Sequence, residues 1–267
     1  MIEIACQTYS LRSRSGPDML ESVRKAGFRA VELWVGHADY RADPGSAARM
    51  RRAAERTGVA LQSYCVGGFV REGVATVADR LARAFAYAAE LGVSLVTGVV
   101  DRRAIPVVDA LCRRTGLRFA VENHWYADIA RGDDWRRALV DASPLVGATL
   151  DTGHAVAAGE DPCAVLAALG ERVLDVHLKD VVVSTRLQRL LWRRPRMEGR
   201  SIGGGDVPIA PLLAALVAAD YAGCVALEDE RPDLPLSELQ ASLRACTGFL
   251  RAAVRQSADG VALESGR

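Results

Sequence analysis

The sequence contains four histidines, two lysines and no apolar stretch long enough to cross a membrane. A membrane-spanning helix needs about 18 consecutive apolar residues, so an integral membrane protein is not expected. The N-terminal segment MIEIACQTYSLR lacks the charged and apolar regions of a signal peptide, and the six cysteines form no Cys-x-x-Cys pair. We therefore expect a cytoplasmic protein with reduced thiols and with neither a zinc knuckle nor a redox disulfide.

The charges of the sequence are almost balanced. It has 34 Lys and Arg residues against 33 Asp and Glu residues, which gives a net charge of +1. Such a chain presents no broad basic face, so nucleic-acid binding is not expected. Half of the 267 residues are hydrophobic, enough to build a substantial core. We expect one domain over residues 1–256 and a flexible polar tail over residues 257–267.

Eight short runs rich in β-branched residues alternate with longer runs of helical period, a pattern typical of repeated βα units with a parallel sheet. The predicted strands are Ile2–Thr8, Ala30–Val35, Ala60–Val66, Leu95–Val100, Phe119–His124, Gly147–Asp151, Val173–Lys179 and Cys224–Glu228. The predicted helices are Asp18–Lys25, Gly45–Arg56, Val74–Leu91, Ala104–Arg114, Asp134–Asp141, 162–169, Ile209–Ala219 and Leu236–Val254. Eight units without a linker favour a single (β/α)8 TIM barrel. An open doubly wound sheet is the rival fold, but no GxGxxG motif follows the first strand.

Proline and glycine mark several of the predicted helix ends. Pro17 opens the first helix and Gly27 ends it, while Asp161 and Pro162 form an N-cap followed by a first-turn proline. Gly170 follows the last turn of the helix predicted over 162–169. The glycine-rich segment GGGDVP, from 203 to 208, is interpreted as a flexible loop before a helix.

Ionisable residues stand at the ends of four consecutive predicted strands. They are Glu122 in AVENHW, Asp151 in ATLDTGH, His177 in LDVHLKD and Glu228 in VALEDE. In a TIM barrel these strand ends meet at the face that carries the active site. Three carboxylates gathered there would repel one another strongly without a cation, so a divalent metal is expected; alternatively, each caps a helix or pairs with an arginine. The oxygen-rich set favours Mn²⁺, with Mg²⁺, Co²⁺ or Zn²⁺ as alternatives.

The order of these motifs resembles the xylose isomerase-like TIM barrel family of sugar phosphate isomerases and epimerases. The resemblance rests on QTYSLR, AVELW, ENHW, LDTGH, VHLKD, GGGDVP and VALEDE, and it covers nearly the whole chain. It implies that Glu122, Asp151, His177 and Glu228 hold a single divalent metal. It also implies that Glu122 and Glu228 lie on opposite faces of a substrate carbon, where one removes a proton and the other returns it.

The first candidate function is therefore a metal-dependent isomerase or epimerase acting on a sugar or cyclitol. A substrate with a hydroxyl beside a carbonyl can chelate the metal, which acidifies the adjacent C–H and stabilises an enediolate. The second candidate is a dehydratase acting on an inosose or a dehydroshikimate-like ring. His124 supports it, because a histidine two residues beyond the metal-binding glutamate resembles the base of 3-dehydroshikimate dehydratases. A non-catalytic barrel subunit is a third alternative, which the complete set of four ionisable residues argues against.

Other polar side chains are candidates for substrate binding. His154 resembles a substrate-binding histidine of the family; otherwise it is an exposed loop residue. Lys179 shares the inward side of its strand with His177 and is expected to hold a substrate oxygen, or else to pair with Glu228 or Glu230. Glu230 also rivals Glu228 as a metal ligand, and Glu228 is preferred because it lies deeper in the strand.

Inward-facing residues of the early strands could complete a substrate pocket. Glu32 and Trp34 share one face of their strand, and Trp125 follows the fifth strand. With Tyr64, the two tryptophans would line a pocket against the apolar faces of a sugar ring. The alternative is that these aromatic residues simply pack at the rim of the barrel. His37 is interpreted as a solvent-facing or rim residue.

The segment 181–200 is unusually rich in arginine. We expect either a lid whose arginines bind a phosphate or carboxylate, or a partly helical insertion that mediates contacts in a homodimer or homotetramer. Its arginines, which surround Trp192, are Arg186, Arg189, Arg193, Arg194, Arg196 and Arg200, and the last is included among the substrate-binding candidates. Endonuclease IV has the same type of barrel as the family that this sequence resembles. Its three-metal cluster needs additional histidine ligands on earlier strands, and the predicted third and fourth strands of this chain contain no histidine.

Overall fold

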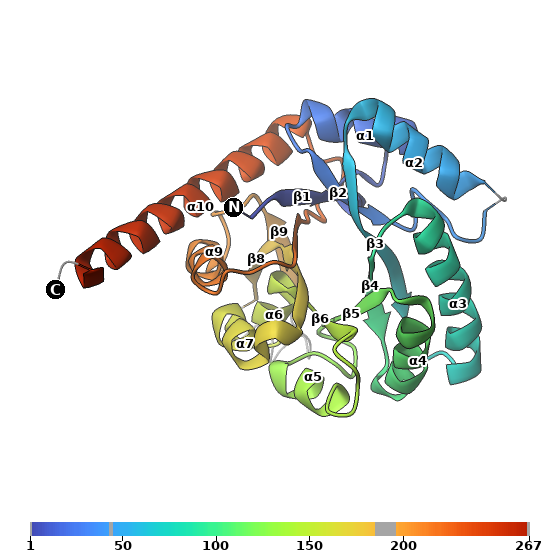
Figure 1. The fold of residues 1–267 in the computed structure, drawn as a ribbon. Helices are drawn as coiled ribbons and strands as arrows, with labels where there is room; N and C mark the ends of the chain where they lie inside the picture. Colours follow the sequence, from blue (N-terminus) through green and yellow to red (C-terminus); the bar gives the residue numbers. More distant parts are fainter. Residues whose placement is uncertain (1, 43–44, 185–195, 266–267) are drawn as a thin grey trace.

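A computed structural model describes residues 2–42, 45–184 and 196–265 of the chain. Eight parallel strands close into a barrel in the order β1-β10-β7-β6-β5-β4-β3-β2, which Figure 1 shows with the helices around its outside. The barrel strands are β1 (Ile4–Gln7), β2 (Ala30–Trp34), β3 (Ala60–Phe69), β4 (Leu95–Val100), β5 (Arg118–Glu122), β6 (Val146–Asp151), β7 (Val173–Leu178) and β10 (Cys224–Leu227). The predicted single (β/α)8 barrel is confirmed.

The α-helices follow the strands along the chain and cover the outer face of the barrel. They are α1 (Gly16–Lys25), α2 (Ser46–Thr57), α3 (Val74–Leu91), α4 (Ile105–Thr115), α5 (Gly132–Ala138), α6 (Thr152–Ala157), α7 (Pro162–Leu169), α9 (Ile209–Ala218) and α10 (Leu236–Ser265). Short 3-10 turns lie at Thr8–Leu11, Arg102–Ala104 and Gly170–Arg172. The predicted N-cap of α7 is present, since the Asp161 side chain accepts a hydrogen bond from the backbone N–H of Cys163.

Strand alternation separates an outer hydrophobic core from a partly polar barrel interior. Ile4 and Cys6 of β1 belong to the large core between strands and helices, whereas Ala5 packs in a small separate cluster with Ala30 and Ala226. The interior can therefore hold polar side chains at other levels, provided that they find partners there.

Three of the strands that carry the candidate site end earlier than predicted. β5 ends at Glu122 because the next turn begins there, with the His124 N–H donating to the Ile129 carbonyl. β7 ends at Leu178 because the Lys179 N–H donates to the Thr152 hydroxyl instead of to a neighbouring strand. β10 likewise ends one residue before Glu228. The side chains at these ends therefore project from the mouth of the barrel or from just beyond the strands.

Two strands and one helix were not predicted. β8 (Asp180–Val183) and β9 (Met197–Arg200) form an antiparallel pair directly after β7, in the segment where a lid or helical insertion was expected. The arginines at 186, 189, 193 and 194, and Trp192, lie outside the described residues. Helix α6 begins immediately after β6, where the Asp151 side chain accepts from the His154 N–H and caps it.

The GGGDVP segment forms the predicted loop before α9, and its backbone is hydrogen-bonded to Asp180 of β8. The Asp180 carboxylate accepts from the backbone N–H groups of Gly203, Gly205 and Val207 at 2.8, 3.0 and 3.3 Å. Asp206 reinforces the contact by accepting from the Val183 N–H at 2.8 Å. The segment is therefore a hydrogen-bonded connection between the mouth of the barrel and α9.

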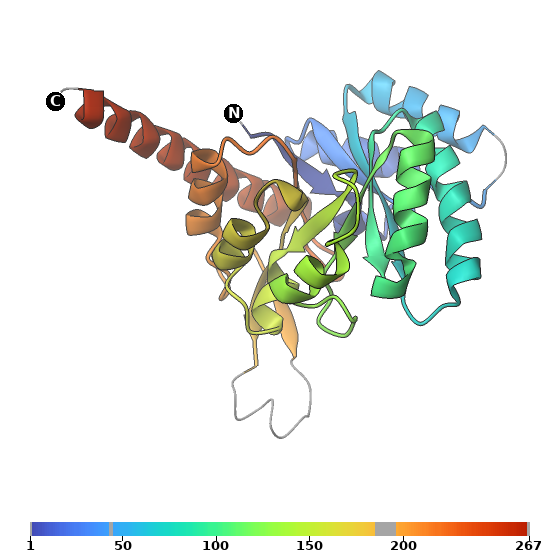
Figure 2. The ribbon, with the colours of Figure 1, turned by 60° about the horizontal axis from the view of Figure 1, so that its bottom comes forward.

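Helix α10 continues beyond its predicted end at Val254 and reaches Ser265. Its C-terminal part extends away from the barrel in both Figure 1 and Figure 2. Residues 257–265 are therefore helical. The expected flexibility of residues 257–267 stays a prediction. Within the described part of the chain, none of the helices has the length and apolar character needed to span a membrane.

Candidate metal centre and active site

Four ionisable side chains from the ends of four adjacent strands meet at the mouth of the barrel. Glu122 and Asp151 are the last residues of β5 and β6, His177 is the next-to-last residue of β7, and Glu228 directly follows β10. Each offers a ligand atom, and these atoms all lie within 4.8 Å of one another. All four residues are buried. The structure thus brings together the four metal-ligand candidates, which we call the quartet.

The His177 imidazole is held between two sets of carboxylates. Its Nδ1 faces the quartet, 3.4 Å from Glu122 Oε1 and 3.3 Å from Glu228 Oε2. Its Nε2 faces the barrel interior, 2.7 Å from Glu32 Oε1 and 3.1 Å from Asp175 Oδ2. The two ring nitrogens therefore serve different neighbours.

Glu32 lies beneath the quartet and is fully buried. The Ser63 hydroxyl donates to its Oε2 at 2.7 Å and the Thr97 hydroxyl to its Oε1 at 3.1 Å. This position does not fit the expected contact with substrate, because His177 and the neighbouring strands enclose the carboxylate. Asp175 was missed by the sequence reasoning, although its place two residues before His177 gives it the same inward direction.

Lys179 follows β7 and places its ammonium among three carboxylates. Its Nζ lies 2.8 Å from Asp151 Oδ2, 3.1 Å from Glu228 Oε2 and 3.0 Å from Glu230 Oε1. Burial alone would lower the pKa of Lys179, but the three carboxylates outweigh it and hold the pKa well above its usual range. The pairing with Glu228 and Glu230 that the sequence left open as an alternative is present.

The quartet carries polar atoms that suit a divalent cation. Three of its atoms are buried and have no partner with hydrogen-bond geometry in the described part of the chain, even though charged groups lie near each of them: Asp151 Oδ2, His177 Nδ1 and Glu228 Oε2. Such atoms are costly to bury without a partner, and a cation placed among them would satisfy all three. Carboxylate oxygens with one imidazole are ligands that Mn²⁺, Mg²⁺ and related ions accept. The residues present therefore fit a divalent metal.

Asn123 supports the quartet and was also missed. Its side-chain amide accepts from the Asp151 N–H at 2.8 Å and donates to the Asp151 carbonyl at 3.1 Å. This pair of hydrogen bonds fixes the end of β6 against the end of β5. Asn123 is part of the ENHW motif, but a single sequence does not show whether its amide connects two strands or is exposed to solvent.

The two glutamates of the quartet have opposite protonation tendencies. Burial raises the pKa of Glu122 to about 7 in spite of the nearby His177. Burial would also raise the pKa of Glu228, but Lys179 and His177 outweigh it, so its pKa lies below the usual range. Near neutral pH the metal-free site therefore pairs a partly protonated carboxyl with an ionised one.

Two neutral imidazoles lie beside the quartet. The rings of His124 and His154 are 3.6 Å apart between centroids, and Tyr126 covers His124 at 3.8 Å. Both ring nitrogens of His154 and Nδ1 of His124 are buried, and residues 2–42, 45–184 and 196–265 offer them no hydrogen-bond partner. Burial lowers the pKa of His124 to about 3 and that of His154 well below its usual value, so each ring is uncharged at neutral pH. His154 is buried rather than an exposed loop residue.

The aromatic candidates divide between the rim and the outer core. Trp34 is half-buried and contacts the ring of Tyr9 edge-on, with centroids 4.9 Å apart. Trp125 is also half-buried and lies against Tyr126. Tyr64 points toward the helices instead, where its hydroxyl donates to the Ala38 carbonyl, so the idea that it lines the pocket was wrong.

The contacts given for His37 and Arg200 are with residues outside the quartet. His37 Nδ1 is 3.1 Å from the Thr8 hydroxyl, and its ring packs edge-on against Trp34. Arg200 on β9 pairs with Glu198 at 2.6 Å and donates to the Gly199 carbonyl. The expected substrate contact of Arg200 stays a prediction.

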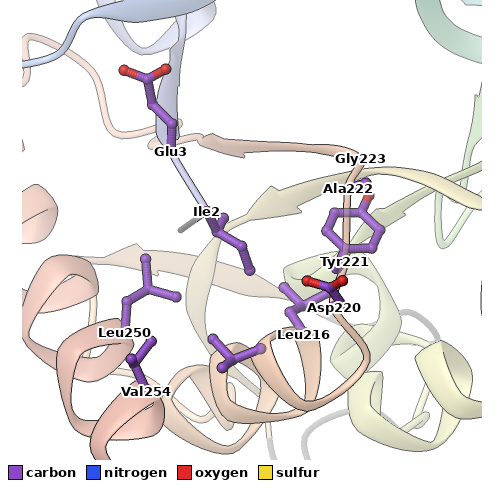
Figure 3. A pocket seen from close by; sticks show the side chains of 10 residues that line it. Ile2, Glu3, Leu216, Asp220, Tyr221, Ala222, Gly223, Leu250 and Val254 are labelled. Atoms are coloured by element: carbon purple, nitrogen blue, oxygen red, sulfur yellow. The ribbon is translucent and has the colours of Figure 1, made fainter.

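The larger cavities lie at the opposite end of the barrel. One of them has a volume of about 390 Å³ and is drawn in Figure 3, where its lining includes Ile2, Tyr221, Leu216 of α9 and Leu250 of α10. Ile2 precedes β1 and Tyr221 precedes β10, so this cavity lies at the amino-terminal ends of the strands. It has no residue in common with the quartet. Active sites of TIM barrels lie at the other face.

A closed parallel barrel with a buried acidic and imidazole cluster at the carboxyl ends of its strands defines a TIM-barrel protein equipped for divalent-metal chemistry. The sequence profile of the xylose isomerase-like TIM barrel family matches residues 20–251. The chain belongs to this family.

Among curated proteins, the chain is similar to the inosose dehydratase of Geobacillus kaustophilus (strain HTA426), with 29% identity over 128 residues. That match covers 45% of this chain and 42% of the dehydratase, so it spans less than half of either protein.

Solved structures share the fold over nearly the whole chain. The probable 3-DHS dehydratase AsbF from Bacillus anthracis has a TM-score of 0.76 at 14% identity, covering 92% of this chain and 99% of its own. The 3-keto-D-glucoside 4-epimerase YcjR from E. coli has a TM-score of 0.73 at 18% identity, covering 92% and 100%. At such identities the likeness establishes the fold alone.

Proposed function

We propose that this protein is a divalent-metal-dependent lyase that removes water from a polyhydroxylated ring ketone, of which an inosose is the model substrate. The observation that carries the proposal is the pair of uncharged imidazoles, His124 and His154, packed against each other beside the quartet. The dehydratases among its relatives and structural neighbours support the same reaction class. The dehydratase was the second candidate from sequence, and we prefer it here because of the two imidazoles.

Proton removal is the step to which His124 is suited. A general base must be unprotonated before it acts, and burial keeps the His124 ring neutral at physiological pH. Its neutral imidazole can accept a proton from the carbon beside the substrate carbonyl, and its Nδ1 has no hydrogen-bond partner among the described residues. As that C–H bond breaks, a carbon–carbon double bond forms and the neighbouring C–O bond breaks. The departing hydroxide takes up the proton that His124 removed and leaves as water, so that a conjugated enone remains.

The other polar residues orient the substrate for this step. When bound to Glu122, Asp151, His177 and Glu228, a divalent metal would polarise the substrate carbonyl and acidify the adjacent C–H. The unpartnered nitrogens of His154 can bind substrate hydroxyls, and Lys179 can hold an oxygen at the mouth. We propose Mn²⁺ as the metal, because oxygen ligands with one imidazole suit it. Trp34 and Trp125 would contact an apolar ring face.

An epimerase is the second candidate, and one observation favours it. Glu122 and Glu228 differ in protonation near neutral pH, as a pair must when one carboxyl removes a proton and the other returns one. A structural neighbour with this activity shares the fold. In that case the carbon beside the carbonyl would change configuration and no water would leave.

Reaction in deuterated water separates the two functions. The Mn²⁺-loaded protein is incubated with an inosose and, separately, with ketoses, and both ultraviolet absorbance and deuterium in recovered substrate are followed. A dehydratase produces an absorbing enone, whereas an epimerase returns deuterated substrate and its epimer without an enone. We expect the enone, and we expect His124→Gln to reduce its rate by about 10²-fold or more.

The matched control is His37→Gln, because His37 contacts Thr8 and Trp34 instead of the quartet. This variant should retain most of the rate. Deuterium exchange without an enone would replace the lyase with the epimerase. An unaltered rate in His124→Gln would remove His124 from the chemistry.

A further inference from the structure

Lys179 and a bound divalent ion would act on the same two carboxylates. The Lys179 Nζ lies 2.8 Å from Asp151 Oδ2 and 3.1 Å from Glu228 Oε2, and both residues belong to the quartet. Only 3% of the lysine side chain is exposed, so water screens this charge weakly. A dication held by the quartet would therefore lie close to a positive charge that the fold has already placed there.

The contacts of the ammonium differ in kind. Lys179 donates a hydrogen bond of 3.0 Å to Glu230 Oε1. Asp151 Oδ2 and Glu228 Oε2 lie within ion-pair distance of it, but no described residue gives either atom a partner with hydrogen-bond geometry. The lysine is thus anchored on Glu230, while its charge acts on two ligand atoms that stay available to a cation.

Glu230 provides a position for the lysine outside the quartet. Its side chain is 40% exposed, and it lies two residues beyond Glu228. The Arg12 guanidinium donates to the Glu230 carbonyl at 2.8 Å and helps to fix this part of the chain. The ammonium can keep its Glu230 partner while it withdraws from Asp151 and Glu228.

We propose that Lys179 is a built-in counter-ion of the quartet, which neutralises Asp151 and Glu228 in the metal-free protein and yields to the divalent metal by withdrawing toward Glu230. The inference rests on the metal site of the proposed function and adds a determinant of metal affinity to it. Withdrawal leaves an ammonium at the edge of the site, beside an incoming substrate oxygen.

This role gives Lys179 two effects of opposite sign. Without the ammonium, the carboxylates of the metal-free protein repel one another, so the apo form loses stability. Without the ammonium, the dication also meets no competing positive charge, so it binds more tightly. A lysine that only packed the site or ordered the ligands would act differently, because its loss would weaken both stability and metal binding.

The test compares the two lysines of the chain. Wild type, Lys179→Met and Lys25→Met are titrated with Mn²⁺ without substrate, by calorimetry and by the electron paramagnetic resonance signal of free Mn²⁺. Lys25 is the matched control, because it is 70% exposed and pairs only with Glu21 among the described contacts. Thermal unfolding is measured in EDTA and in saturating Mn²⁺.

We expect Lys179→Met to lower the Kd for Mn²⁺ by about tenfold or more and to lower the Tm in EDTA by several degrees, with much of that loss recovered in Mn²⁺. Lys25→Met should change neither quantity appreciably. An unchanged or higher Kd in Lys179→Met would overturn the proposal.

A second variant protects the test against misfolding. Lys179→Gln keeps a polar side chain of similar length but carries no charge, and the same tighter binding is expected of it. If both variants unfold in EDTA, Mn²⁺ should restore their folded signal, and failure to do so overturns the proposal. Absence of Mn²⁺ binding by the wild type would instead refute the metal site, and the role of Lys179 with it.

Discussion

His177 Nε2 and Glu32 Oε1 lie 2.7 Å apart inside the barrel, although 145 residues separate them in the chain. Glu32 also accepts hydrogen bonds from the Ser63 and Thr97 hydroxyls. Because the Glu32 carboxylate accepts hydrogen bonds, His177 Nε2 must carry a proton in order to donate to it. In a neutral imidazole the lone pair then lies on Nδ1, which faces the quartet. Carboxylates that hold the second nitrogen of a metal-binding histidine commonly fix its ring in this way.

The first prediction concerns this support. Glu32→Gln should weaken Mn²⁺ binding by about 10- to 100-fold, because an amide holds the imidazole less firmly in the required orientation. Ser63→Ala is the milder comparison, since it removes one hydrogen bond to Glu32 and should cost about 1 kcal/mol of stability. Both are checked by Mn²⁺ titration and denaturant unfolding. Wild-type affinity in Glu32→Gln would show that the orientation of His177 does not depend on Glu32.

The second prediction is that the stability of the metal-free protein depends on pH through the Glu122 carboxyl. Its folded pKa of about 7 lies above the ordinary value of 4.5 because of burial. The carboxyl therefore contributes stability to the metal-free protein that is fully present below pH 4.5 and is lost as the pH rises through about 7.

Metal binding must displace the same proton. The affinity for Mn²⁺ should therefore fall below pH 7, by about tenfold for each pH unit if one proton is displaced. Calorimetry in two buffers of different ionisation enthalpy should count about one proton more released at pH ~6 than at pH ~8.5. Equal proton release at the two pH values would contradict the raised pKa.

The third prediction concerns the connection from β8 to α9. A Cβ on Gly205 would lie 2.2 Å from Asp180 Oδ1 and 2.7 Å from the Val181 carbonyl. Gly205→Ala should therefore disturb the hydrogen bonds that Asp180 makes to this segment, at a cost of about 1–3 kcal/mol. The comparison is Gly248→Ala in α10, where a Cβ meets nothing within 4 Å.

Gly248→Ala should stabilise the protein by about 0.5–1 kcal/mol, because alanine is the better helix former. Denaturant unfolding of the two variants measures the difference. Equal stability of Gly205→Ala and wild type would mean that Asp180 can move away without loss.

The pattern of the sequence was sufficient for the barrel and for the position of the quartet. Alternating βα units predict a parallel barrel, and in such a fold Glu122, Asp151, His177 and Glu228 stand at strand ends that must meet. The prediction was less accurate for elements that depend on a single local contact. The end of β7 is set by a hydrogen bond to the Thr152 hydroxyl. The hydrophobic periodicity of the sequence does not indicate such a contact.

Partners across the barrel could not be predicted from one sequence. Glu32 was expected to contact the substrate, because its position in the strand indicates that its side chain points into the barrel. The sequence does not indicate how deep inside the barrel that side chain lies. Tyr64 was one candidate for the pocket, with packing at the rim as the alternative. In the structure the neighbouring Ser63 takes the inward position and donates to Glu32. Asp175 shares the direction of His177 and was overlooked because it precedes the strand end.

What the sequence by itself determined is the barrel, with the strand ends that carry the four candidate ligands, because hydrophobic periodicity and the order of units are local properties of the chain. Only the tertiary structure decided that Glu32 and Asp175 support His177 from below, that His124 packs on His154, and that Lys179 joins Asp151, Glu228 and Glu230. These contacts join residues from different strands and loops. Their distances depend on how the closed barrel aligns its strands, and that alignment is a property of the whole packed molecule.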